Sequence, residues 1–183
     1  MSNKNKLIIV LMIITSIMFI TIQFVIIPQN RKKQIEYNEK QMDASTHDIT
    51  TIKEYKSKYM GDSSNVINLF SRLPLNNIPR RFEINSDKLS LTVNYLDTVR
   101  NVGKEKIHRD LVYNTVASMA TIDNLSEVTY KFSKETFIFK REQVEKVFGN
   151  NLSELLKSDI WKMKVQERIS SNDFINEFYT SNK

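Results

Sequence analysis

The chain has 183 residues, carries 27 Lys and Arg against 21 Asp and Glu, and contains no cysteine. The absence of cysteine excludes disulfides, a cysteine nucleophile and thiolate metal ligands. The net charge of +6 comes from scattered side chains without a dense Lys/Arg cluster, a distribution that does not favour a nucleic-acid-binding protein.

An uncharged apolar run, residues 7–27, is the first element, and a short tail of residues 1–6 precedes it. As a helix this run is about 31 Å long, close to the hydrocarbon core of a bilayer at about 30 Å. We therefore predict a single transmembrane anchor in contact with membrane lipid. A cleaved signal peptide fits less well, because its apolar core is shorter and small residues precede its cleavage site, whereas residues 24–27 are all large.

The orientation of this anchor is predicted from its flanks. Lys4 and Lys6 lie on one side and residues 31–33 (Arg-Lys-Lys) on the other, so the positive-inside rule hardly separates the two orientations. A very short N-terminal tail usually stays in the cytoplasm, and we expect residues 1–6 to do so. The C-terminal part is then extracytoplasmic at the cell membrane, and its composition, rich in Lys, Asn and Ile without cysteine, is typical of a Gram-positive bacterium of low GC content.

Two further regions follow the anchor. Residues 28–50 are polar and sustain no heptad, which predicts a polar stalk, helical near the membrane and flexible from Asp43 to Thr50. Residues 51–183 are long enough for one folded domain. Lys4 and Lys6 are the only charges before Pro28, so the part beyond the anchor has 25 basic and 21 acidic residues, a net charge of +4.

The domain is expected to open with two short helices. Thr51 and Glu54 have the spacing of a capping box, and Gly61 suits the left-handed residue that ends a helix. Asp62 or Ser63 then caps a second helix.

The hydrophobic period changes four times after Pro74. Apolar residues alternate over 82–95 and again over 128–139, which predicts two β-hairpins, and a helical period covers 104–122 between them. Further helices are expected over 141–148 and from Asn151. The tail over 159–183 fits either a strand or a helix, and we favour a helix. The sum is an α+β fold with an antiparallel sheet of about four strands packed against helices.

Three segments carry a family resemblance. They are Tyr59–Val66 (YMGDSSNV) with Leu73–Pro74 after it, Leu91–Tyr95 (LTVNY) and Ile122–Val128 (IDNLSEV). Their order and spacing resemble the extracytoplasmic Firmicutes family called domain of unknown function 4825. The resemblance implies a location and an architecture but no reaction. The turn at Ser86–Lys88 departs from the Pro-Tyr-Gly turn of the family, which leaves the type of the first turn open.

No catalytic, cofactor-binding or metal-binding residue is predicted. The only histidines, His47 and His108, form no zinc motif, and we expect His108 to be an exposed surface residue. No serine-nucleophile motif or phosphate-binding glycine loop occurs. Four carboxylates are considered as pairs for glycan hydrolysis: Asp62, Asp110, Asp123 and Glu127. Asp62 is explained more simply as a helix cap and Asp123 as a turn former.

These observations predict a membrane-anchored extracytoplasmic domain, a non-enzymatic interaction or sensing module at the bacterial cell envelope. The expected partners are an envelope protein or a wall polymer, with strand addition at an exposed sheet edge as the mode for a peptide. The alternative is an envelope hydrolase that acts on cell-wall polymers through paired carboxylates.

Overall fold

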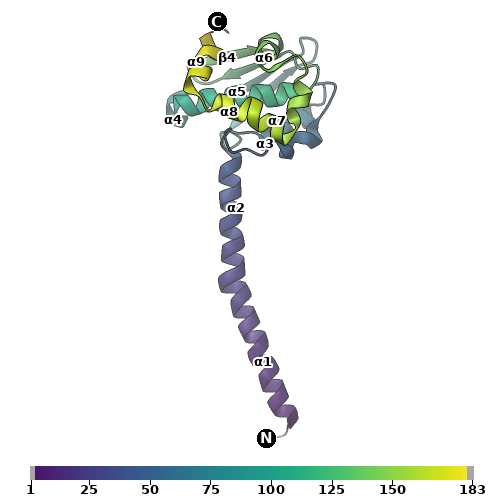
Figure 1. Ribbon diagram of the computed structural model, residues 1–183, viewed down its shortest axis with the longest axis vertical. Coiled ribbons are helices and arrows are strands. Elements are labelled where there is room, and N and C mark those ends of the chain that lie inside the picture. Colours follow the sequence, from purple (N-terminus) through teal and green to yellow (C-terminus); the bar gives the residue numbers. More distant parts are fainter. Residues whose placement is uncertain (1–2, 181–183) are drawn as a thin grey trace. The chain divides into compact units, whose positions relative to one another are not determined.

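The structure is a computed structural model that describes residues 3–180 (Figure 1). The chain divides into two compact units, one up to Glu39 and one from Lys40 onward. Each unit is described by itself.

The first unit is a single run of helix. It consists of α1 (Asn3–Thr21), the π-helical turn η1 (Ile22–Ile26) and α2 (Ile27–Gln41). The span 3–41 is long and apolar enough to cross a membrane, and none of its residues through α2 is buried by protein. The hydroxyls of Thr15, Ser16 and Thr21 donate to carbonyls of the preceding turn, so these three hydroxyls need no water. The predicted helix at the start of the stalk is confirmed.

The second unit alternates short helices with two hairpins. Its strands are β1 (Arg80–Asn85), β2 (Ser90–Tyr95), β3 (Glu127–Lys131) and β4 (Thr136–Lys140). Its longer helices are α3 (Ser63–Arg72), α5 (Lys104–Thr121), α6 (Arg141–Phe148) and α9 (Asn172–Thr180). Its short helical segments are η2 (Ile49–Tyr55), α4 (Val99–Val102), η3 (Leu152–Leu156), α7 (Ser158–Trp161), η4 (Lys162–Gln166) and α8 (Glu167–Ile169).

The four strands form one sheet in the order β1-β2-β3-β4. Both hairpins are antiparallel, as predicted, but β2 and β3 pair in parallel, with Leu91 opposite Val128. The parallel pair follows from the chain between the hairpins: α4 and α5 carry it back along the sheet, so β3 starts at the same end as β2. The α+β fold is confirmed, and its sheet is mixed.

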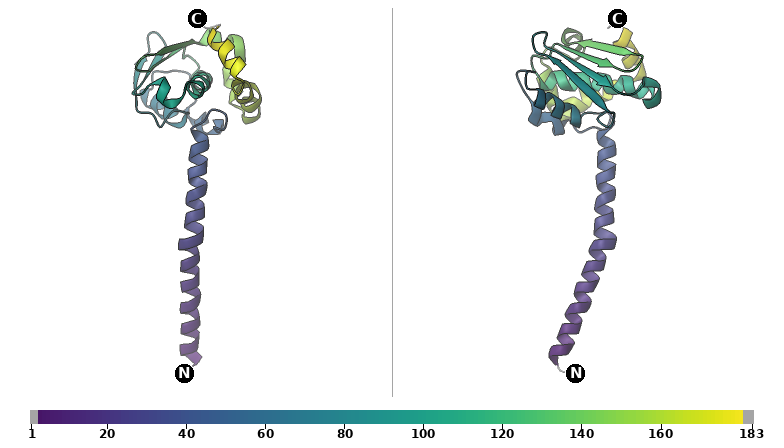
Figure 2. Two further views of the ribbon diagram at one scale, coloured as in Figure 1. Left: turned by 90° about the vertical axis from the view of Figure 1, so that its left-hand side faces the viewer. Right: turned by 180° about the vertical axis from the view of Figure 1, so that it is seen from behind.

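The second unit has three layers. α5 lies on one face of the sheet, and the C-terminal helices α7, α8 and α9 cover the other side of α5 (Figure 1; Figure 2, left). The far face of the sheet has no helix over it (Figure 2, right). Because α5 is enclosed on both sides, every residue from Asp110 to Ile122 is buried, including the polar ones. The helical tail favoured for residues 159–183 is confirmed through Thr180, and residues 181–183 lie outside the described part.

The segment predicted to be flexible, Asp43 to Thr50, belongs to the folded unit instead. Ala44, His47 and Ile49 are at most 2% exposed. The Ala44 N–H donates to the Asp110 carboxylate (3.1 Å), a contact between residues far apart in the sequence. The prediction failed because the few apolar residues of this segment reveal no period of their own.

Two of the predicted helix ends differ from the structure, and a third is confirmed. The first helix of the domain is the 3₁₀ helix η2, and Asp48 caps it through the Thr50 N–H (2.9 Å), so the capping box proposed at Thr51 and Glu54 is wrong. Gly61 does not have a positive φ. The Asn65 N–H donates to Asp62 (3.0 Å), which confirms the helix cap there.

Candidate functional site

The uncovered face of the sheet has no role in the core. Its side chains form three rows across the four strands, polar except for Ile138. The rows are Arg81-Asn94-Lys131-Thr136, Glu83-Thr92-Thr129-Ile138 and Asn85-Ser90-Glu127-Lys140. The face carries both signs of charge together with hydroxyl and amide groups, so it offers both hydrogen-bond donors and acceptors.

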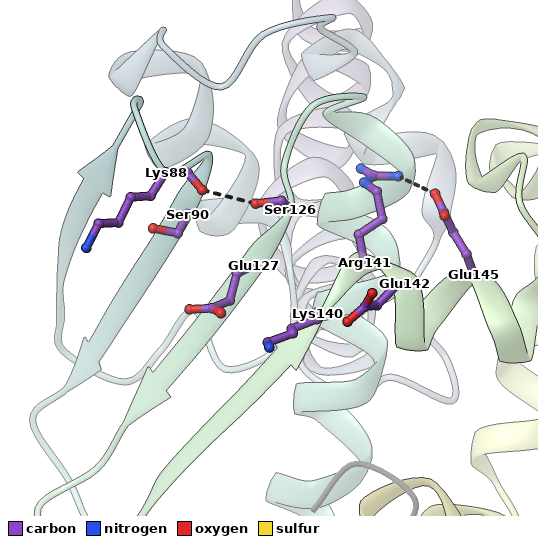
Figure 3. A pocket seen from close by; sticks show the side chains of 8 residues that line it. All are labelled: Lys88, Ser90, Ser126, Glu127, Lys140, Arg141, Glu142 and Glu145. Atoms are coloured by element: carbon purple, nitrogen blue, oxygen red, sulfur yellow. Dashed lines mark hydrogen bonds and ion pairs between the residues drawn. The ribbon is translucent and has the colours of Figure 1, made fainter.

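A cavity of about 500 Å³ lies at one end of this face (Figure 3). It is bounded by the β1–β2 turn, the start of β3, the end of β4 and the start of α6, and it has a mixed charge. The lining residues are Lys88, Ser90, Ser126, Glu127, Lys140, Arg141, Glu142 and Glu145.

The turn beside this cavity is fixed to β3. Leu89 has a positive φ of 51°, an uncommon conformation for a branched side chain. Its carbonyl accepts from the Ser126 N–H (2.8 Å), the Ser126 hydroxyl (2.8 Å) and the Glu127 N–H (3.3 Å). These three bonds hold the strained residue in place and give the cavity a rigid wall.

Arg141 makes the most hydrogen bonds of the charged residues that line the cavity, and they occupy most of its donors. Its Nε donates to the Leu125 carbonyl and its Nη2 to the Met119 and Ile122 carbonyls, all at 2.8 Å. Its Nη1 pairs with Glu145 at 3.4 Å. Arg141 therefore completes the C-terminal end of α5 and is not free to bind a ligand.

The four carboxylates considered from the sequence do not come together. Asp62 caps α3, and Asp123 is exposed beyond α5. Asp110 is buried inside α5, where it pairs with Lys106. Only Glu127 lines the cavity, and the carboxylates beside it, Glu142 and Glu145, were not among the four.

Sequence analysis also missed a buried polar cluster around His47. The His47 Nδ1 lies 2.7 Å from the Tyr113 hydroxyl, and its Nε2 lies 2.8 Å from the Arg72 carbonyl. The Trp161 indole N–H donates to the same hydroxyl (3.1 Å). This cluster joins the segment after α2 to α5 and to the C-terminal helices, so its role is in the core.

A second cavity, of about 530 Å³, lies along the outer edge of β4. We call it the edge groove. Its floor is aromatic: the His108 ring stacks on Tyr179 with centroids 4.4 Å apart, and Phe137 meets both rings edge-on. His108 is thus half-buried rather than a fully exposed surface residue, and burial lowers its pKa below the ordinary value, helped by the nearby charge of Lys104.

No group of three His, Cys, Asp or Glu suited to hold a metal ion occurs among residues 3–180. Fold and site together define a class of protein: an α+β domain with an open polar sheet face, preceded in the chain by one helix long and apolar enough to cross a membrane.

The family described as Domain of unknown function (DUF4825) matches residues 52–144, about half of the chain, and the chain belongs to this family. The resemblance predicted from the sequence motifs is thereby confirmed. No curated protein and no solved structure matches the chain.

Proposed function

We propose that the protein is a single-pass membrane protein of the cell envelope, whose extracytoplasmic domain binds a partner without catalysing a reaction. The observation that supports this proposal most directly is the uncovered face of the sheet. A four-stranded sheet with a packed core on one side presents three rows of polar groups on the other, fixed by the strand register. A rigid polar surface of this kind suits recognition of a protein or a wall polymer.

The apolar helix supports the location in a membrane. Its large side chains, such as Leu7 (62% exposed) and Phe24 (74% exposed), have no cover from the described part of the chain. A soluble protein rarely leaves so long an apolar surface in water. Lipid around residues 7–27 removes this cost.

Orientation is tested by cysteine labelling. The chain has no cysteine, so a single introduced cysteine is the only thiol that a maleimide can label. Ser64 is exposed on α3, and Asn5 lies near the start of α1. In intact cells a membrane-impermeant maleimide should label the Ser64→Cys variant and not the Asn5→Cys variant. The reverse pattern places the domain in the cytoplasm and refutes the proposal.

Partner binding is tested by photo-crosslinking in intact cells. A photoreactive residue replaces Thr92, in the middle row of the uncovered face, and Met163 (57% exposed), on η4, serves as the control. We expect a crosslinked product from position 92 and none from position 163. Absence of any product at 92 contradicts the proposal.

The alternative function is an envelope hydrolase that uses Glu127 and Glu142, which share the cavity of Figure 3. Purified full chain should then release soluble fragments from wall material, and the double variant Glu127→Gln, Glu142→Gln should not. We expect no release from either protein.

A further inference from the structure

The hydrogen bonds at the two ends of the β3–β4 ladder show which backbone groups of β4 do not bond to β3. The Phe132 N–H donates to the Glu135 carbonyl, and the Arg141 N–H donates to the Ser126 carbonyl, both at 2.8 Å. Hydrogen-bonded pairs alternate with non-bonded pairs in an antiparallel ladder. The odd-numbered residues of β4 therefore bond to β3, and the even-numbered residues direct their N–H and C=O to the outer edge.

Two residues of this edge keep both groups unused. β4 is the last strand of the sheet, and in the described part of the chain no backbone bond reaches Thr136 or Ile138 from outside it. The Lys140 N–H is different, because it donates to the Gln143 side chain (3.0 Å). Free N–H and C=O groups that recur at every second residue of a strand are matched best by the backbone of another strand.

The edge groove runs beside these groups. Its walls come from β4, α5 and α9, and they include Lys104 and Asn176 as well as the aromatic floor of His108, Phe137 and Tyr179. A strand added to β4 places alternate side chains on the helix side of the sheet. An apolar side chain of that strand would contact the floor of the groove.

We propose that β4 receives an extended peptide of a partner protein, with an apolar side chain in the edge groove and an acidic side chain towards the Glu135 end of the strand. The acidic preference follows from the charges at this end, where the exposed Lys104 and Lys134 outnumber the carboxylate of Glu135, whereas Lys140 at the other end shares a cavity with Glu127 and Glu142. The proposal rests on the binding function above and adds the β4 edge to the uncovered face as a contact of the same partner.

A second copy of the chain fits this edge less well. If β4 paired with another β4, the side chains on the helix side would be Phe137 and Phe139 of each copy. Phe139 is only 1% exposed, because it packs against Phe178 and Tyr179 of its own chain. It cannot enter a neighbouring groove, so a dimer through β4 would leave both grooves unfilled.

The test is a selection of phage-displayed random peptides against the full chain in detergent micelles, followed by binding measurements on the synthetic winners. Ile138→Pro removes the outward N–H that β3 does not use, a change that an edge strand tolerates. Ile138→Thr is the matched control, which keeps the N–H. Asn176→Trp fills the groove, and circular dichroism shows whether each variant folds.

We expect the selected peptides to have alternating side chains, an apolar centre and an acidic residue on one side of it. Ile138→Pro should weaken their binding about tenfold, whereas Ile138→Thr should stay within about threefold. Asn176→Trp should also weaken binding. Three results overturn the proposal. The first is that no peptide is selected, and the second is that the selected peptides bind Ile138→Pro as tightly as the parent. The third is that the full chain forms a dimer that Ile138→Pro disrupts but that the selected peptides do not disrupt. A crosslinked product at position 92 without peptide winners leaves the binding function intact and rejects the β4 edge.

Discussion

At the scale of single residues, His47 has one protonation state that satisfies all its neighbours. The Arg72 carbonyl can only accept, so the His47 Nε2 carries the proton and Nδ1 accepts from the Tyr113 hydroxyl. That hydroxyl in turn accepts from Trp161. Burial, the main cause, lowers the pKa of His47 below the ordinary 6.5, against the opposing effects of the bond to Arg72 and the charge of Asp48. The folded protein therefore holds a neutral imidazole.

This arrangement predicts a loss of stability in mild acid. As the pH falls, the unfolded chain binds the proton before the folded one does, so the contribution of His47 is full above pH 6.5 and is lost below it. His47→Gln should cost roughly 1–3 kcal/mol at about pH 8, and the gap to the parent should shrink towards about pH 5. Urea unfolding of the full chain in micelles, followed by the fluorescence of the single Trp161, measures the gap. A gap that stays constant contradicts the prediction.

Asp110 has the opposite dependence on pH. Burial raises the pKa of its carboxyl from 3.8 to about 6, although the Lys106 ammonium and the Ala44 N–H lower it. Its contribution is therefore full below pH 3.8 and is lost as the pH rises through about 6. Asp110→Asn keeps an acceptor for Ala44 and cannot ionise. As the pH rises from about 4 to about 7 the parent should lose stability through Asp110 and the variant should not, so the difference between their free energies of unfolding should shift by up to about 3 kcal/mol in favour of the variant. If the difference between the unfolding free energies of variant and parent stays constant across this pH range, the prediction is wrong.

At the scale of elements, the C-terminal end of α5 depends on one side chain from another helix. The last carbonyls of a helix lack partners within the helix. Two of the three carbonyls that Arg141 binds, at Met119 and Ile122, belong to this end of α5. Since α5 is the central layer of the fold, α6 stabilises it through Arg141 as well as through its own apolar face.

Replacement of Arg141 should accordingly cost more than loss of its ion pair. Arg141→Lys cannot reach three carbonyls at once, and we expect a loss of about 2–4 kcal/mol. Glu145→Gln removes only the partly buried ion pair, keeps a hydrogen-bonding side chain, and should cost less than about 1 kcal/mol. Thermal unfolding followed by circular dichroism compares them, and equal melting temperatures for the two variants would argue against the role of Arg141.

The elements that could be predicted are those whose signal is local. The alternation over β1–β2 and β3–β4 and the helix from Arg141 to Phe148 are readable within a few residues. The parallel pairing of β2 with β3 and the docking of Ala44 on Asp110 involve partners far apart in the sequence, which no local period encodes. From the sequence, strand addition is expected at an exposed sheet edge without an indication of which edge, and the groove beside β4 could not be predicted, because α9 supplies one wall.

At the scale of the whole molecule, the core extends beyond the part that matches the family. The match ends at residue 144, within α6, yet the helices after it cover α5. The buried apolar side chains beyond this point are Phe148, Leu152, Leu155, Leu156, Trp161, Val165, Ile169, Ile175 and Phe178. At about 1.5–3 kcal/mol for each of these nine side chains, their joint contribution is roughly 14–27 kcal/mol, at least comparable with the 5–15 kcal/mol by which a domain is usually stable.

Truncation after Gly149 should therefore unfold the second unit and not only trim it. The polar face of α5 gives a second reason, because the Tyr113 hydroxyl loses the Trp161 donor and faces water. Limited proteolysis of the protein in membrane vesicles should degrade residues 40–149 of this truncated chain while the full chain resists. Truncation after Ser171 removes only α9, with Ile175 and Phe178, and should leave a weakened but folded unit. If the chain cut after Gly149 resisted the protease as well as the full chain does, the family-matched part would be a folding unit of its own, and the C-terminal helices would be an attachment to it.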